Sequence, residues 1–147
     1  MEALNKLNEI NFMKPYELLT FESNFDLSGK LISYEYPSNI PFEIRRLYSI
    51  YDTSSQLSRG FHAHKTLKQA IFSVHGSVEI LLDDGTKKET ILLDDPLKCL
   101  LIQAPVWREM HNFQDDCVLN VLCDQPYNPL DYIRNYQNFV SFLAQNE

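Results

Sequence analysis

The sequence predicts an all-β domain, a sandwich or a barrel, that ends in one α-helix. Three observations predict this fold: short runs of β-branched and aromatic residues, turn residues between them, and a change to helical periodicity near the carboxyl terminus. A chain of 147 residues with 44% hydrophobic residues is large and apolar enough for one domain with a core. We divide it into an N-terminal extension over residues 1–15 and a single domain over residues 16–147.

Eight segments have the length and composition of strands. They are Tyr16–Phe21, Lys30–Tyr36, Ile44–Tyr51, Gln69–Val74, Ser77–Leu82, Lys88–Leu93, Lys98–Ile102 and Cys117–Cys123. Between them, Asp83-Asp84-Gly85-Thr86 predicts a hairpin turn, and His75-Gly76 predicts a tight turn that separates two strands. The prolines near residues 37–41 and at residue 96 mark two further breaks.

The last part of the chain changes to a period of three to four residues. The apolar residues that recur at this spacing are Leu130, Ile133, Tyr136, Val140 and Leu143. Pro129 precedes them, and proline is favoured in the first turn of a helix. We therefore expect a helix that packs its apolar face on the barrel.

Composition and charge exclude several classes of function. The net charge of -7 disfavours a nucleic acid or an anionic membrane as the partner. No apolar run approaches the roughly 20 residues that span a bilayer, and the polar N-terminus lacks a signal-peptide core. We expect a cytoplasmic protein whose three cysteines, Cys99, Cys117 and Cys123, are buried thiols.

The segment Arg59–Lys65 contains the residues with the clearest chemical meaning. His62 and His64 are two apart, so in an extended strand both imidazoles point to the same face. With Gln69 and Gly76 they complete a spacing that resembles the first motif of the cupin superfamily, in which His, His and Glu bind a metal. Here Gln69 occupies the Glu position, and a neutral amide is a poor ligand for a hard cation. We therefore expect acid–base chemistry with no metal and no cofactor.

Four motifs extend this likeness along the chain. In order they are Ile40–Tyr48, Arg59–Lys65, Val106–Phe113 and Asp131–Tyr136. The series resembles the dTDP-4-keto-6-deoxyglucose 3,4-ketoisomerases, the WxcM-like branch of the cupins. The resemblance implies a cupin jelly-roll barrel, a homodimer with exchanged N-terminal strands, and transfer of the keto group from carbon 4 to carbon 3 of a dTDP-linked sugar.

Such an isomerisation requires a base near neutral pH and a donor for the oxygen proton, and histidine suits both. We expect His64 to carry the carbon proton and His62 to serve the oxygen side, although the residues favour this order only slightly. Gln69 is expected to hydrogen-bond one imidazole and fix its tautomer.

The substrate-binding residues are expected around the histidines. Arg46 and Arg59 are candidates for the diphosphate, with Lys65 as a supporting charge, because guanidinium groups suit phosphate oxygens. Trp107 is either a core residue or a surface for the sugar, and Tyr127 either closes over the sugar or is an ordinary half-exposed tyrosine.

Two positions depart from part of the family. Arg108 stands where some members carry His after the tryptophan, and Ser28 stands where some carry Arg before a turn glycine. Members also differ in product configuration at carbon 4. A guanidinium is too weak an acid to protonate carbon, so we expect Arg108 only to bind or orient the sugar oxygens and the proton on carbon 4 to come from the side of His62 and His64. We therefore favour the gluco product, which would feed an aminotransferase in the synthesis of a surface polysaccharide.

Two other functions remain open from the residues. One is a nucleotide-sugar 3,5-epimerase of the same fold, which uses a single His base and fits the paired histidines less well. The other is a non-catalytic cupin that binds a sugar or a metal.

Overall fold

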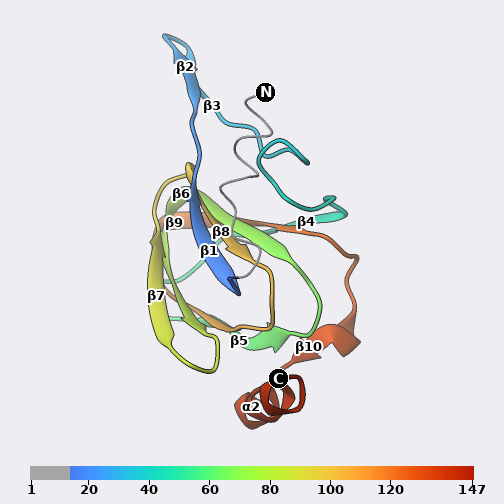
Figure 1. The fold of residues 1–147 in the computed structure, drawn as a ribbon. Coiled ribbons are helices and arrows are strands. Elements are labelled where there is room, and N and C mark those ends of the chain that lie inside the picture. Colours follow the sequence, from blue (N-terminus) through green and yellow to red (C-terminus); the bar gives the residue numbers. More distant parts are fainter. Residues whose placement is uncertain (1–13) are drawn as a thin grey trace.

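A computed structural model describes residues 14–147 and confirms the all-β barrel with one C-terminal helix (Figure 1). Eight strands form one antiparallel sheet in the order β1-β8-β6-β9-β5-β10, with β4 added to β9 and β7 added to β6. The elements are β1 Tyr16–Thr20, β2 Asn24–Asp26, β3 Gly29–Leu31, β4 Arg46–Ile50, β5 Arg59–His64, β6 Gln69–Asp83, β7 Lys88–Leu93, β8 Lys98–Ile102, β9 Trp107–Cys123, η1 Pro129–Asp131, β10 Tyr132–Ile133 and α2 Tyr136–Gln145. Of the expected N-terminal extension, residues 1–13 lie outside the described residues.

Two long strands, β6 and β9, pair with each other and link the two halves of the sheet. The first part of β6 pairs with β8 and the last part with β7, while β9 pairs with β5 near its start and with β4 near its end. The alternating inward side chains of these strands form the main hydrophobic core between the facing layers, with fully buried Ile71, Leu82 and Val121 among them.

The prediction of a tight turn at His75-Gly76 is wrong, because β6 continues without interruption from residue 69 to residue 83. Its register against β9 shifts between Ser73 and Glu79, so the glycine serves a β-bulge and not a chain reversal. Gly76 has a φ of 65°, and an added Cβ would meet the carbonyl oxygen of Gln114 at 2.3 Å. Close backbone approach therefore requires glycine here.

Two expected strands also have different limits. The strand expected to begin at Cys117 begins ten residues earlier, at Trp107. The earlier start was not predicted because Arg108 takes an inward position that an alternating pattern would assign to an apolar side chain. The strand expected over Lys30–Tyr36 ends at Leu31. Beyond it the chain leaves the ladder, and Tyr34 stacks on Phe72 on the outer face of the sheet.

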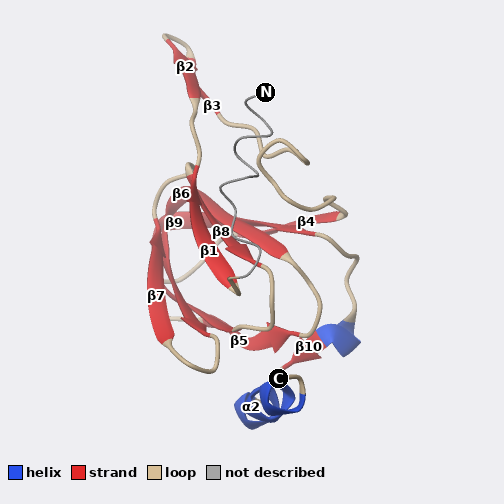
Figure 2. Ribbon diagram, viewed as in Figure 1, coloured by secondary structure: helices blue, strands red, loops and turns tan. Residues whose placement is uncertain are grey.

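The helix begins later than its apolar spacing indicates (Figure 2). Pro129 opens a single 3-10 turn, β10 follows by pairing with β5, and α2 starts at Tyr136 after the N-cap Asn135. The buried face also differs from the expectation. Leu130 is 79% exposed, whereas Phe139 is fully buried.

A hairpin of β2 and β3 projects from the body of the barrel as a separate two-stranded sheet (Figure 1). Its apolar side chains Phe25, Leu27 and Leu31 are largely exposed. Among the described residues, no helix has the length and apolar character required to cross a membrane.

Candidate active site

A bulge in β5 brings an arginine and a histidine onto the inner face of the barrel. Arg59 lies opposite Met110, and His62 lies opposite Arg108, so β5 takes one more step than β9 between these pairs. Phe61 is the extra residue, with a φ of 59°. Met110 and Arg108 are buried inside the barrel, so Arg59 and His62 face inward as well. In a regular strand, a spacing of three would place them on opposite faces.

The two histidines form a hydrogen-bonded series that ends at a carboxylate. Nε2 of His62 lies 3.2 Å from Nε2 of His64, and Nδ1 of His64 lies 3.1 Å from Oδ2 of Asp131. Asp131 also accepts hydrogen bonds from the backbone N–H and hydroxyl of Thr66 and from the N–H of Leu67. Because a carboxylate only accepts, His64 donates from Nδ1 and presents the lone pair of Nε2 to His62.

Asp131 therefore has the role that was expected of Gln69, namely to fix the tautomer of an imidazole. Gln69 instead accepts from Nη1 of Arg108 and donates to the hydroxyl of Tyr48 at 3.1 Å. The sequence contained a signal for Asp131, since the residue opens the fourth recognisable motif. It was missed because Pro129 and the apolar spacing assigned that motif to a helix.

Burial keeps both imidazoles neutral. Removal from solvent, with a further contribution from the positive Arg108, lowers the pKa of His62 to about 4. Burial and the same arginine also lower the pKa of His64, and Asp131 opposes this only in part. Burial would raise the pKa of Asp131, but the hydrogen bonds from Thr66 hold it below the ordinary value, so the carboxylate stays ionised. At neutral pH His62 can therefore accept a proton.

The lowered pKa values predict that the protein loses stability in mild acid. Between about pH 6.5 and about pH 4, unfolded chains bind protons at these histidines that the folded chain does not. The free energy of unfolding should therefore decrease as the pH is lowered through this window, by up to about 1.4 kcal/mol per pH unit for each imidazole. Urea unfolding at several pH values measures the slope. His62→Asn should flatten it and a change at the exposed His75 should not; equal slopes in all three proteins would contradict the assignment.

An open cavity of about 430 Å³ lies beside the histidine series. His62 lines it, whereas His64 is only 2% exposed and lies behind His62. The arginines and tyrosines of the lining are Arg46, Arg59, Arg134, Tyr48, Tyr127 and Tyr132. Of these, Tyr48, Tyr132 and Arg134 were not expected from the sequence.

The remaining expected site residues lie at different distances from this cavity. Arg108 is buried inside the barrel, next to Gln69, and burial lowers its pKa only to about 10, so it remains charged. The Trp107 ring packs against Tyr136 and Phe139 on the outside of the sheet. Lys65 is exposed and lines a separate hollow beside α2. The structure thus gathers Arg46, Arg59, His62 and Tyr127 around one cavity. Four residues that were expected to bind the substrate do not line it, namely Trp107, Lys65, Gln69 and Arg108. Within the described part of the chain, no three His, Cys, Asp or Glu side chains are grouped to hold a metal ion.

Comparisons with known proteins identify a family and similar enzymes. The family model FdtA, described as WxcM-like, C-terminal, matches residues 14–144. A TDP-4-oxo-6-deoxy-alpha-D-glucose-3,4-oxoisomerase from Aneurinibacillus thermoaerophilus is 43% identical over 129 residues, which cover 88% of this chain and 93% of that protein.

Solved structures agree with this. The 3,4-ketoisomerase QdtA from Thermoanaerobacterium thermosaccharolyticum, in complex with TDP, has a TM-score of 0.87 and 37% identity, and the match covers 90% of this chain and 96% of QdtA. The TDP-quinovose 3,4-ketoisomerase WlaRB from Campylobacter jejuni has a TM-score of 0.84 and 41% identity, with 87% and 98% covered. The rmlC epimerase of Mycobacterium tuberculosis is only 17% identical at a TM-score of 0.70, with 80% of this chain and 67% of that one covered, and so shares the fold alone.

Proposed function

The chain belongs to the WxcM-like FdtA family, and from this membership we propose that it is a cytoplasmic 3,4-ketoisomerase of dTDP-4-keto-6-deoxyglucose. The observation that carries the proposal is the pair of neutral, hydrogen-bonded imidazoles beside an arginine-lined cavity. The relatives are named for this reaction, and one of them holds TDP. The more distant epimerases do not support the alternative of a 3,5-epimerase.

The reaction moves two protons and needs no electron acceptor. A base removes the proton on carbon 3, which the neighbouring ketone acidifies, and a 3,4-enediol forms as oxygen 4 gains a proton. Carbon 4 is then protonated, and the proton on oxygen 3 is lost as the new ketone forms. Neutral histidine is suited to the first step.

We assign the removal of the carbon proton to His62, and not to His64 as the sequence led us to expect. The reason is access, since the ring of His62 lines the cavity and His64 is buried behind it. Nε2 of His62 donates to His64, so the proton is accepted at Nδ1, which is buried without a hydrogen-bond partner in the free protein and has to become accessible when the substrate binds. His64 then stabilises the imidazolium that forms on His62, because its Nε2 accepts a hydrogen bond and its Nδ1 is held by ionised Asp131. The positive charge on His62 is then balanced by the negative charge of Asp131, with neutral His64 hydrogen-bonded between them.

The nucleotide is assigned to the arginine and tyrosine side of the cavity. Arg46 and Arg59 bind the diphosphate, for which a guanidinium provides paired donors. The guanidinium of Arg46 already lies 5.4 Å from the ring centre of Tyr48 and 5.7 Å from that of Tyr127. Tyr127 is 60% exposed in this arrangement and can cover a bound ligand.

We favour the gluco product, dTDP-3-keto-6-deoxyglucose. Arg108 is buried and does not line the cavity, so it cannot deliver a proton to carbon 4, and the chain is 41% identical to an enzyme named for TDP-quinovose, a gluco sugar. In the gluco series the hydrogens on carbons 3 and 4 lie on opposite faces of the ring. His62 therefore cannot return its own proton to carbon 4, and the expectation that this proton comes from the side of the histidines does not fit the gluco product. Tyr48 also lines the cavity and is our choice for that donor, because burial raises its pKa to about 12, so that its hydroxyl carries a proton at neutral pH.

The proposed activity is tested by incubating the purified, EDTA-treated protein with dTDP-4-keto-6-deoxyglucose in ordinary water and following the sugar by NMR. The ketone signal should move from carbon 4 to carbon 3, and the ring proton on carbon 4 should show a large diaxial coupling to its neighbour on carbon 5. A small coupling would mean the galacto epimer and overturn the assignment at carbon 4. Recovery of activity only after a divalent ion is added would favour a metal-binding cupin, and no conversion under either condition would contradict the isomerase.

We also propose a homodimer in which the β2–β3 hairpin of each chain packs on the other. A two-stranded hairpin is marginally stable in water by itself, and this one exposes Phe25, Leu27 and Leu31 away from the barrel. Light scattering should give a molar mass twice that of the 17.2 kDa chain. Phe25→Ser together with Leu27→Ser should shift the mass towards one chain, whereas a monomeric native protein would contradict the proposal.

A further inference from the structure

Three side chains on the outer face of β9 belong to a hydrogen-bonded series that the reaction does not use. Oγ of Ser58 lies 2.7 Å from Nδ1 of His111, and Nε2 of His111 lies 2.8 Å from Oε2 of Glu109. Nε1 of Trp107 donates to the other oxygen of Glu109 at 3.0 Å. Along β9 these residues alternate with buried Arg108 and Met110, so they point away from the cavity.

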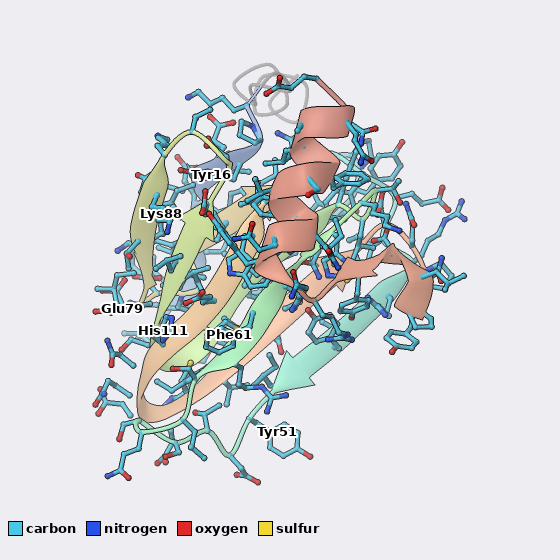
Figure 3. The ribbon with its side chains drawn as sticks, turned by 90° about the horizontal axis from the view of Figure 1, so that it is seen from below. Tyr16, Tyr51, Phe61, Glu79, Lys88 and His111 are labelled. Atoms are coloured by element: carbon cyan, nitrogen blue, oxygen red, sulfur yellow. The ribbon has the colours of Figure 1, made fainter. Side chains whose placement is uncertain are left out.

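This series contacts the bulge of β5 on both sides of Arg59. Ser58 directly precedes the arginine, and its hydroxyl donates to Nδ1 of His111, because His111 uses Nε2 to donate to a carboxylate. Two residues after the arginine, the ring of Phe61 meets the His111 imidazole edge to face, with 5.8 Å between centroids (Figure 3). His111 therefore holds the chain before the bulge and the extra residue within it.

The bulge requires such support because its backbone is unfavourable. Phe61 has a φ of 59°, a left-handed conformation that a residue with a bulky Cβ substituent adopts only at a cost. Gly60, at a φ of 89°, sits so close to β9 that an added Cβ would meet the carbonyl oxygen of Arg108 at 3.0 Å. If the bulge relaxed to a regular strand while His62 kept its place, Arg59 would turn to the outer face.

We propose that His111 is a positioning residue for nucleotide binding: with Ser58 and Phe61 it holds the bulge that turns Arg59 into the cavity. The inference rests on the proposed function, in which Arg59 binds the diphosphate of the substrate. It assigns to an outer-face histidine an effect on affinity that acts entirely through Arg59.

Calorimetric titration with TDP, together with kcat at saturating substrate, tests this. Arg59→Ala should weaken TDP binding on the order of 10- to 100-fold, the effect of a lost charged hydrogen bond. His111→Ala should weaken it in the same direction, and the double variant should bind no more weakly than Arg59→Ala alone, because both changes remove one interaction. His111→Gln, which can both donate and accept, should restore most of the affinity, and the loss in His111→Ala should appear in KM and not in kcat.

Two further variants keep the test decisive. Ser58→Ala removes one exposed hydroxyl and should weaken TDP binding by a few fold even if His111→Ala does not fold. His75→Ala, a change at an exposed histidine on another strand, should leave binding unchanged. Losses that add in the double variant, or His111→Ala and Ser58→Ala variants with native TDP affinity, would overturn the inference while Arg59→Ala still supported the proposed site. Native affinity in Arg59→Ala would instead overturn the proposed diphosphate role and the inference with it.

Discussion

The His62→Asn variant should lose a factor on the order of 10²–10⁴ in kcat while its affinity for TDP stays within about twofold of the native protein. The imidazole is assigned to a proton transfer that occurs only in the transition state, so its loss should not affect ground-state binding. His62 lines the cavity, and its Nε2 lies 3.2 Å from that of His64. Asparagine keeps a polar group of similar size there but is not a base.

Steady-state kinetics and a TDP titration measure both quantities on the same preparation. His75→Asn is the matched control, since it makes the same chemical change at an exposed histidine outside the cavity. His64→Asn should also lower kcat, but by less than His62→Asn, because His64 acts through its neighbour. Turnover by His62→Asn within a few fold of the native rate, or a larger loss in His64→Asn, would restore the order of roles expected from the sequence.

Asp131→Asn should lower kcat by on the order of 10² or more and destabilise the fold by about 1–3 kcal/mol. The carboxylate accepts from Nδ1 of His64, from the N–H and hydroxyl of Thr66 and from the N–H of Leu67. An amide has one accepting oxygen, so its NH₂ group must face either Thr66 or His64. If it faces His64, the imidazole changes tautomer and presents an N–H to His62, and the support for the imidazolium is lost.

Kinetics and urea unfolding separate the two effects of this substitution. Asp124→Asn is the matched control, because that carboxylate also accepts a backbone hydrogen bond, from the N–H of Lys68 at 2.9 Å, but is not part of the histidine series. A native kcat in Asp131→Asn, with or without a loss of stability, would show that the carboxylate serves the fold and not the proton transfer.

Local spacing was sufficient to predict the paired histidines but not the bulge beside them. His62 and His64 are two residues apart within a regular stretch of β5, so the alternation of a strand places both inside the barrel. Arg59 reaches the same face only because Phe61 is an extra residue against β9, and a single strand read alone carries no information about its partner's register.

The other differences between prediction and structure arise where a polar residue of the site occupies the position of an apolar side chain, or where segments far apart in the sequence come into contact. Arg108 occupies a core position, so the alternation of β9 could not be seen in the sequence. Gln69 faces Arg108 and Tyr48 instead of an imidazole, a contact set by the meeting of three strands. Asp131 reaches His64 across 67 positions of sequence, through a turn that local periodicity assigned to a helix.

The removal of the carbon 3 proton by His62 is tested most directly by hydrogen exchange in deuterated water. With dTDP-4-keto-6-deoxyglucose followed by NMR, the native protein should yield a 3-keto product that carries deuterium at carbon 4. His62→Asn should leave the signal of the carbon 3 proton undiminished over the same period, while the variant still binds TDP. Loss of that signal in His62→Asn at a rate within a few fold of the native protein would contradict the claim.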